Sequence, residues 1–251
     1  MFSLEGKVAL ITGSTKGIGK SIAEQMAKAG AKVVISSRKA DACLDVQKEF
    51  TAAGHTAIAL PCNIARKEEV EALVAGTLKQ WGRIDILVCN AATNPIYGPM
   101  AAASDDAFDK IMGTNIKSNF WLANLTIPQM AERKDGVVII VSSIAALKGN
   151  TVIGLYGVSK AADAGLVRNL ACEWGPHNIR VNAIAPGLVR TDFARALWED
   201  EKARKAREAA TPLRRLGEPD DIGGIAVMLA SRAGNFITGQ MIVADGGVTI
   251  A

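Results

Sequence analysis

Short apolar runs alternate with amphipathic segments along the whole chain. Each run is rich in valine, isoleucine or alanine and has the length of a strand buried in a sheet. The runs predict strands at residues 8–11, 32–36, 56–61, 84–89, 137–141, 181–184 and 241–243. Between them, apolar side chains recur at helical spacing. This spacing predicts helices over residues 18–30, 67–81 and 155–174, and one long or broken helix within residues 105–133.

This regular alternation predicts an α/β fold. We expect a doubly wound, Rossmann-type parallel sheet of seven strands with helices on both faces. The chain has 251 residues, and neither a repeat nor a linker-like change of composition divides it. We therefore expect one domain spanning residues 1–251. Residues 190–215 are dense in charge and contain no predicted strand, so they are the best candidate for an insertion.

Charge and cysteine spacing argue against several classes of protein. The net charge is only +4, and the basic residues are scattered, so we expect no nucleic-acid partner. No uninterrupted apolar run approaches the length that crosses a bilayer, so we expect no membrane partner. The four cysteines and two histidines are too widely spaced for a metal site or a disulfide framework. With a first segment unlike a secretory signal, this pattern favours a cytoplasmic protein without a metal.

A glycine-rich turn joins the first predicted strand to the first predicted helix. Its glycines follow the spacing G-x-x-x-G-x-G, which allows a tight turn and lets the backbone approach a pyrophosphate at a helix N-terminus. The alternative is a tight turn that binds nothing. We expect this turn to bind a dinucleotide through Gly13, Ser14, Thr15, Lys16, Gly17, Ile18 and Gly19.

The end of the second predicted strand indicates which dinucleotide. An acidic residue there would bind a ribose 2′-hydroxyl, but the chain has Arg38 and Lys39. A guanidinium can bind a 2′-phosphate through paired charge-assisted hydrogen bonds. The pattern therefore predicts NADP(H), with Lys16 as a further positive charge, unless Arg38 and Lys39 are solvated loop residues.

Three polar residues form the predicted catalytic group. Ser143 follows the strand at residues 137–141, and Tyr156 and Lys160 lie one helical turn apart. Positive charge on Lys160 favours the phenolate of Tyr156 and lowers its pKa. The phenol can then act as general acid in carbonyl reduction and general base in alcohol oxidation. Ser143 would donate a hydrogen bond to the oxygen on which negative charge develops.

Together these motifs resemble those of the short-chain dehydrogenase/reductase family, in its branch of similar chain length, over essentially the whole sequence. The matching positions are residues 12–19, Cys89-Asn90-Ala91-Ala92, Asn115, Ser143, Tyr156, Lys160 and Pro186-Gly187. The resemblance implies further cofactor contacts at Asn63, Ile64, Asn90, Ala91, Tyr156, Lys160, Pro186, Gly187, Val189 and Thr191.

The resemblance also implies roles and an assembly that spacing alone does not. Asn115 would be catalytic, fixing a water that relays protons to Lys160, and Lys160 would also hold the nicotinamide ribose. A homotetramer would form through the long helices and the segment near Asp245. The chain departs from the usual family pattern at Cys89 and Ala92, where asparagine and glycine are typical, and at Asn63, where an acid is typical.

The segments expected to wall the substrate site are residues 93–99, 144–153 and 188–198. They supply a mostly apolar wall, which suits a ketone or aldehyde with an apolar body: Ile144, Leu147, Ile153, Phe193, Leu197 and Trp198. We expect residues 188–215 to form a mobile substrate lid. The stretches at residues 93–95, 196–198 and 215–219 are similar to those of peroxisomal-type NADPH-dependent carbonyl reductases.

Several functional readings stay open at this stage. The first is an NADP(H)-dependent carbonyl reductase. The second is a reductase of 3-oxoacyl chains on a carrier protein or coenzyme A, or a steroid or sugar alcohol dehydrogenase. The third is a non-catalytic NADP(H)-binding regulator, against which the intact set of Ser143, Tyr156 and Lys160 argues.

Overall fold

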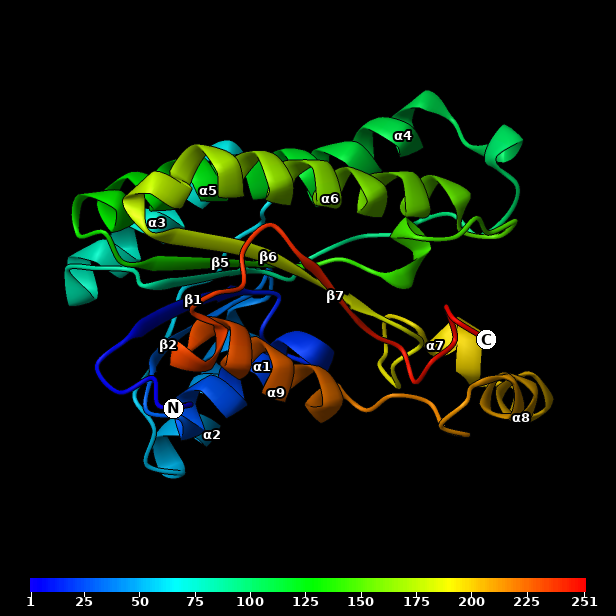
Figure 1. Ribbon diagram of the computed structural model, residues 1–251, viewed down its shortest axis with the longest axis horizontal. Coiled ribbons are helices and arrows are strands. Elements are labelled where there is room, and N and C mark those ends of the chain that lie inside the picture. Colours follow the sequence, from blue (N-terminus) through cyan, green and yellow to red (C-terminus); the bar gives the residue numbers. More distant parts are fainter.

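The computed structural model describes residues 1–251, and its centre is a parallel sheet of seven strands (Figure 1). Their order across the sheet is β3-β2-β1-β4-β5-β6-β7. The strands are β1 (Val8–Thr12), β2 (Lys32–Ser36), β3 (Ala57–Ala59), β4 (Ile86–Cys89), β5 (Gly136–Val141), β6 (Ile179–Pro186) and β7 (Met241–Ala244). The chain winds outward from β1 in one direction and from β4 in the other, so a crevice opens where these two strands end. The predicted doubly wound, Rossmann-type sheet is confirmed.

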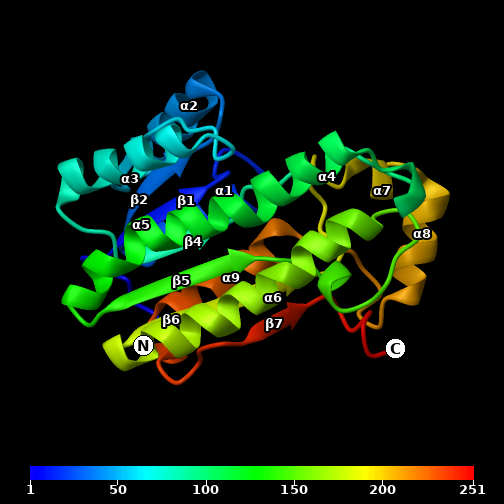
Figure 2. The ribbon, with the colours of Figure 1, turned by 90° about the horizontal axis from the view of Figure 1, so that it is seen from above.

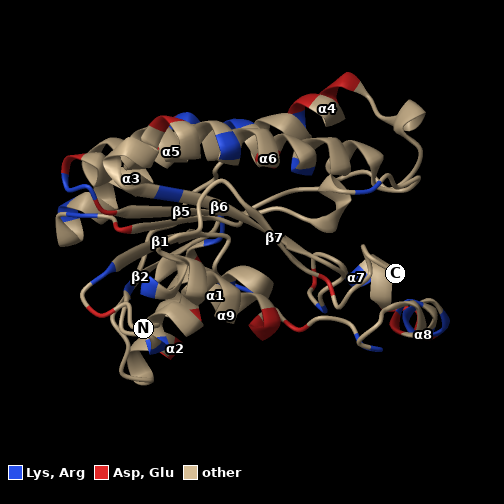
Figure 3. Cartoon of the chain, viewed as in Figure 1, with Lys and Arg blue, Asp and Glu red and all other residues tan.

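Helices cover both faces of this sheet (Figures 1 and 2). One face carries α3 (Lys67–Trp81), α5 (Ser118–Glu132) and α6 (Gly154–Trp174). The other carries α1 (Gly17–Lys28), α2 (Ala40–Ala52) and α9 (Pro219–Ala230). The remaining helices lie toward the carboxyl ends of the strands: α4 (Asp105–Met112), α7 (Arg195–Trp198) and α8 (Glu201–Ala210). Both charge signs occur on α8, which buries no residue (Figure 3).

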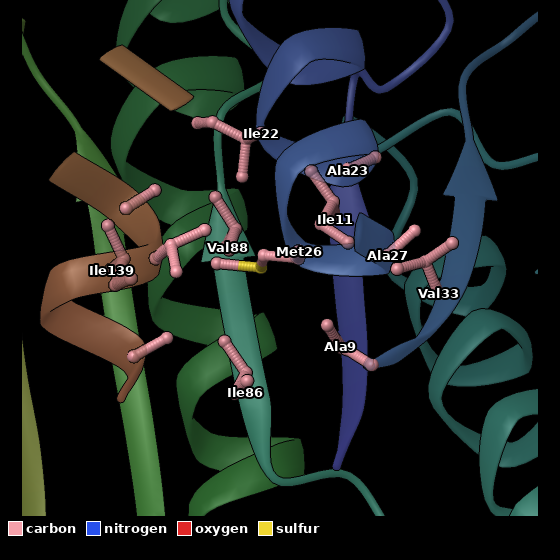
Figure 4. Close-up of a cluster of buried hydrophobic side chains, with 14 of the residues drawn as sticks. Ala9, Ile11, Ile22, Ala23, Met26, Ala27, Val33, Ile86, Val88 and Ile139 are labelled. Atoms are coloured by element: carbon pink, nitrogen blue, oxygen red, sulfur yellow. The ribbon is translucent and has the colours of Figure 1, made fainter. Parts of the chain in front are cut away.

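Two apolar cores separate the sheet from these helices, because successive side chains of a strand point to opposite faces. On the first face, Ile22 and Met26 of α1 pack against Ile11, Val88 and Ile139 (Figure 4). On the opposite face the neighbouring strand residues belong to the second core: Leu10, Leu87, Val138 and Ile140. Every residue of β1, β4 and β5 is buried, as expected of strands covered on both faces.

Two of the helices that cover the sheet, α2 and α9, were not predicted from the sequence. Only Cys43, Val46 and Phe50 of α2 are buried, so its apolar stripe is thin. In α9, Gly223 and Gly224 lower the intrinsic preference for a helix. The region at residues 105–133, predicted as one long or broken helix, is broken: a π-helical turn at Gly113–Lys117 separates α4 from α5.

The two glycines of α9 differ sharply in their surroundings. A Cβ at Gly223 would lie 2.6 Å from Ser21 Oγ and 3.2 Å from Ser21 O, so α9 needs this glycine to approach α1. A Cβ at Gly224 would meet nothing within 4 Å. This glycine pair is therefore a matched probe of how closely α9 packs against α1.

We expect Gly223→Ala to lower the free energy of unfolding by about 1–3 kcal/mol, because it overpacks a helix contact. The control Gly224→Ala should raise the same quantity by about 0.5–1 kcal/mol, because alanine is the better helix residue. Chemical denaturation of the two variants measures both values. Equal effects of the two substitutions would contradict the packing described for α1 and α9.

Candidate active site

A cavity of about 910 Å³ lies at the carboxyl ends of the strands. It extends from the glycine turn and Arg38 to Ser143, Tyr156 and Lys160. The structure thus brings the predicted dinucleotide turn and the predicted catalytic side chains into one continuous space. Most other predicted cofactor contacts also line it: Asn63, Ile64, Asn90, Ala91, Pro186, Gly187, Val189 and Thr191.

The glycine turn is held against the end of β4. Gly13 and Gly17 have φ of +66° and +55°, which an L side chain rarely adopts. A Cβ on Gly19 would lie 2.3 Å from Gly13 O and from Asn90 Nδ2. Asn90 Nδ2 donates to the carbonyl oxygens of Thr12 and Gly13, at 2.9 and 3.2 Å. The glycines therefore let α1 start close to the sheet, and Asn90 fixes the turn through these two hydrogen bonds.

The N-terminus of α1 has free donors. No side chain caps it, and the N–H groups of Ile18 and Gly19 donate no hydrogen bond within the chain. Both residues line the cavity. Unpaired N–H groups and the positive end of the helix dipole are suited to a phosphate group. The turn therefore fits the pyrophosphate of a dinucleotide.

Two residues expected to contact cofactor do not line this cavity. Ser14 is fully buried: its hydroxyl donates to Ile11 O at 2.8 Å and accepts from Ser36 N at 2.9 Å. Ser14 thus joins the turn to β2. Lys39 precedes α2 and is exposed to solvent. Ser14 therefore faces the sheet, and Lys39 is exposed outside the cavity lining, so cofactor contacts by these two residues stay predictions.

Basic residues near the cavity are placed differently from one another. Arg38 lines it, is exposed, and takes part in no ion pair or side-chain hydrogen bond. Lys16, expected as a second charge near Arg38, instead lies 3.4 Å from Asp192 in the lid segment. Arg38 is therefore the positive group available at the end of β2.

The three predicted catalytic residues meet where β5 ends and α6 begins. Ser143 follows β5, and its hydroxyl accepts from Ala145 N at 3.1 Å. Lys160 Nζ donates to Val141 O at 2.9 Å and lies 5.7 Å from the centre of the Tyr156 ring. A Cβ on Gly157 would lie 2.9 Å from Ala145 O, so this glycine lets α6 approach the segment after Ser143.

The pKa of Tyr156 lies above its usual value in the chain alone. Burial raises it, and the Asp163 carboxylate adds to that effect. The Lys160 ammonium and the Ser143 hydroxyl act in the opposite direction. The expected influence of Lys160 is therefore present, but burial outweighs it, and the expectation of a lowered pKa is wrong for the chain without cofactor.

Asn115 is fully buried in the π-helical turn and does not line the cavity. Its amide oxygen accepts from Thr93 N at 2.8 Å. Its amide nitrogen donates to Thr93 O at 3.1 Å and to Ser159 Oγ at 3.0 Å. All its side-chain hydrogen bonds therefore lie within the protein, and it ties α6 to the loop after β4.

The substrate wall differs in part from the prediction. Ile144, Ile153, Phe193 and Leu197 line the cavity as expected, and the Phe193 ring centre lies 6.1 Å from that of Tyr156. Two predicted wall residues do not line it: Leu147 is half exposed, and Trp198 Nε1 donates to Thr191 O. Tyr97, Lys148 and Val152 of the expected wall segments, and Arg207 and Leu213 of the expected lid, also line the cavity. Lys110 lines it too and lies outside every segment that the sequence analysis expected there.

The other side-chain chemistry is limited. No group of three or more histidine, cysteine, aspartate or glutamate side chains could hold a metal ion. Cys43, Cys62 and Cys89 are buried free thiols, and Cys172 is an exposed one. None of the helices combines the length and the apolar character needed to cross a membrane.

Comparison with known proteins identifies the family. A family model described as "Enoyl-(Acyl carrier protein) reductase" matches residues 13–249. "Dehydrogenase/reductase SDR family member 4" of Bos taurus is 41% identical over 244 residues, covering 97% of this chain and 88% of the relative. The protein of the same name from Oryctolagus cuniculus is 42% identical, covering 97% of this chain and 94% of the relative.

Solved structures agree. A 7α-hydroxysteroid dehydrogenase complexed with NADH and 7-oxo glycochenodeoxycholic acid is 38% identical with a TM-score of 0.94, covering 98% of this chain and 95% of that one. A gluconate 5-dehydrogenase from Burkholderia cenocepacia in complex with NADP and tartrate is 32% identical with a TM-score of 0.95, covering 100% and 98%. With relatives at 41–42% identity and a family match along nearly its whole length, this chain belongs to the short-chain dehydrogenase/reductase family of oxidoreductases.

Proposed function

We propose that this protein is an NADPH-dependent reductase of ketones and aldehydes with apolar bodies. The observation that carries the proposal is the single cavity that joins Arg38, the α1 N-terminus and the group Ser143, Tyr156 and Lys160. Its apolar wall, including Ile144, suits a carbonyl compound with few polar groups.

The residues divide the chemistry between them. A nicotinamide bound in the cavity supplies the hydride. Ser143 donates a hydrogen bond to the carbonyl oxygen, where negative charge develops. Tyr156 gives that oxygen its phenolic proton, and the Lys160 ammonium stabilises the phenolate left behind. Asn115 positions α6 by donating a hydrogen bond to Ser159 Oγ.

The choice of NADPH rests on Arg38. It is a cavity-lining cation at the end of β2 with no carboxylate partner in the chain, and Ser37 beside it also lines the cavity. A 2′-phosphate would supply the missing partner. Related structures hold NADH in one case and NADP in another, so family membership does not decide between them.

A second candidate is a reductase of 3-oxoacyl thioesters on a carrier protein or coenzyme A. Three cavity-lining cations favour it: Lys110, Lys148 and Arg207 take part in no ion pair. They would suit the phosphate groups that such substrates carry.

Initial rates separate these functions. NADPH and NADH oxidation would be measured with apolar ketones, aromatic diketones, steroid ketones and a 3-oxoacyl thioester. The proposal expects fast turnover of apolar ketones with a clear NADPH preference. Turnover of the thioester alone would support the second candidate. NADPH binding without turnover of any compound would contradict both and indicate a non-catalytic regulator.

We also propose that residues 188–215 form a mobile lid, within a single domain that assembles as a cytoplasmic homotetramer. The lid is held at its edges by ion pairs between exposed side chains, Lys16 with Asp192 and Arg190 with Glu218 at 3.5 Å. Such pairs contribute little to stability. Val189 belongs to the first core and Thr211 is buried, but residues 190–210 include no buried residue, so that part of the segment can open without loss of a buried core.

Hydrogen exchange tests the lid, with β5 as the internal reference. We expect amides of residues 201–210 to exchange much faster than those of β5, because α8 buries none of its residues. Added NADPH should slow them if the lid closes over it. Exchange as slow as in β5, with and without NADPH, would refute the lid.

A further inference from the structure

Asp163 is a fully buried carboxylate next to the proposed catalytic group. It lies on α6, three residues after Lys160, and its side chain is 0% exposed. Its Oδ2 is 3.3 Å from Lys160 Nζ, whose side chain is 2% exposed. Two charged groups rarely share a dry interior unless each is paired. The proposed mechanism above leaves this carboxylate without a role.

A shell of donors faces the Asp163 carboxylate and favours its anion, against the effect of burial. Asn119 Nδ2 on α5 donates to Asp163 Oδ1 at 3.2 Å. The Ser142 hydroxyl after β5 donates to Lys160 O at 2.9 Å and also lowers the pKa of Asp163. Asn119 also donates to Asn115 O at 2.7 Å, which couples the shell to the π-helical turn. Helices α5 and α6 lie over the same face of the sheet (Figures 1 and 2).

The titratable groups around this pair are few. Tyr156 faces Lys160 and Asp163 from α6, Cys89 faces them from the end of β4, and Tyr97 lies near enough to Tyr156 to raise its pKa. Burial raises the pKa of the Cys89 thiol, so that side chain stays neutral. The groups from α5 and β5, Asn119 and Ser142, carry no charge. The cluster therefore comprises one phenol, one ammonium and one carboxylate.

We propose that Asp163 is a positioning residue for Lys160, a buried counter-ion that makes the cluster of Tyr156, Lys160 and Asp163 electrically neutral while the phenol is protonated. Losing the phenolic proton then leaves one uncompensated negative charge beside two buried charged groups. Without the carboxylate, the same loss would turn a net positive cluster into a neutral one. Buried net charge is unfavourable, so Asp163 raises the pH at which Tyr156 loses its phenolic proton.

The direction of the Lys160 pKa shift agrees with a buried carboxylate counter-ion. Burial lowers the pKa of Lys160, but Asp163 and then Tyr156 act the other way, and the pKa ends above its usual value. Burial raises the pKa of Asp163, against the effect of Lys160. Because carbonyl reduction needs the protonated phenol, Asp163 would extend reduction to higher pH. This effect on reduction rests on the proposed function, whereas titration of the Tyr156 phenol requires no turnover.

The chain offers a direct optical test because it has only two tyrosines, Tyr97 and Tyr156. In a Tyr97→Phe background, the near-ultraviolet absorbance of tyrosinate reports Tyr156 alone. We expect Asp163→Asn in that background to lower the pH at which tyrosinate forms by about 1 unit or more. Circular dichroism recorded at each pH separates titration of the folded protein from unfolding.

Matched variants keep the result interpretable. Asp163→Glu retains the charge and should titrate close to the background protein. Tyr97→Phe with Tyr156→Phe should give no tyrosinate signal. Asp163→Ser removes the same charge with a smaller side chain and replaces the asparagine variant if that variant does not fold.

An unchanged or raised tyrosinate titration in the neutral variants would overturn the proposal. A lowered titration in a protein that reduces no carbonyl compound would support Asp163 as a counter-ion and refute the proposed function. An active enzyme whose tyrosinate titration does not shift would refute Asp163 as a counter-ion and support the proposed function. In active enzyme, the alkaline limb of the reduction rate should move to lower pH with the tyrosinate titration.

Discussion

Tyr156→Phe is expected to lower kcat for carbonyl reduction by about 10²–10⁴-fold, the usual contribution of a positioned general acid. The substitution removes only the phenolic oxygen from a half-buried ring that contacts Phe193. The cavity and the α1 N-terminus remain, so the Kd for NADPH should change only a few-fold. Steady-state rates and fluorescence titration with NADPH measure the two quantities.

The second tyrosine provides the control. Tyr97 also lines the cavity, and Tyr97→Phe removes the same atom from a residue outside the group Ser143, Tyr156 and Lys160. Its effect should fall on KM more than on kcat, because no proton is transferred there. Near-normal turnover by Tyr156→Phe would refute the assignment of Tyr156 as the proton donor.

Arg38→Leu is expected to weaken NADPH binding by about 10- to 100-fold, because a charge-assisted contact contributes about 1.5–3 kcal/mol. NADH lacks the 2′-phosphate, so its affinity should change little. The preference for NADPH would therefore shrink or disappear. Kd values for both dinucleotides, measured at one salt concentration, provide the comparison.

Lys39→Leu is the matched control, since it removes the same charge from the next residue. Lys39 is exposed and does not line the cavity, so its loss should leave the NADPH preference intact. Equal losses from Arg38→Leu and Lys39→Leu would mean that only the general charge of this loop matters. An NADH preference in the native chain would refute the role of Arg38.

The parts of the fold that could be predicted are those with a strong local pattern. The β-branched run at residues 137–141 and the apolar stripe of α3 carry their period in the sequence. Helix α9 does not, because Gly223 serves a contact with Ser21 that only the folded chain creates. Asn115 likewise occupies a π-helical turn whose hydrogen-bond partners come from Thr93 and Ser159.

The functional site also contains residues that local spacing could place and residues that it could not. Tyr156 and Lys160 could be paired from sequence because one helical turn separates them. Ser14 could not be placed, because after Gly13, at φ +66°, the chain turns its hydroxyl toward Ser36. A carboxylate at residue 163 is visible in the sequence, but its burial depends on α5 and β5 closing over it.

The central claim is that this cavity transfers a hydride from NADPH to a carbonyl carbon while Tyr156 supplies the proton. The direct measurement uses NADPH carrying deuterium at the transferable position of the nicotinamide, with an apolar ketone that the enzyme turns over. The account predicts deuterium on the carbinol carbon of the product, one atom per NADPH consumed, and almost none with Tyr156→Phe. NADPH consumption without deuterium on that carbon, or unimpaired transfer by Tyr156→Phe, would contradict it.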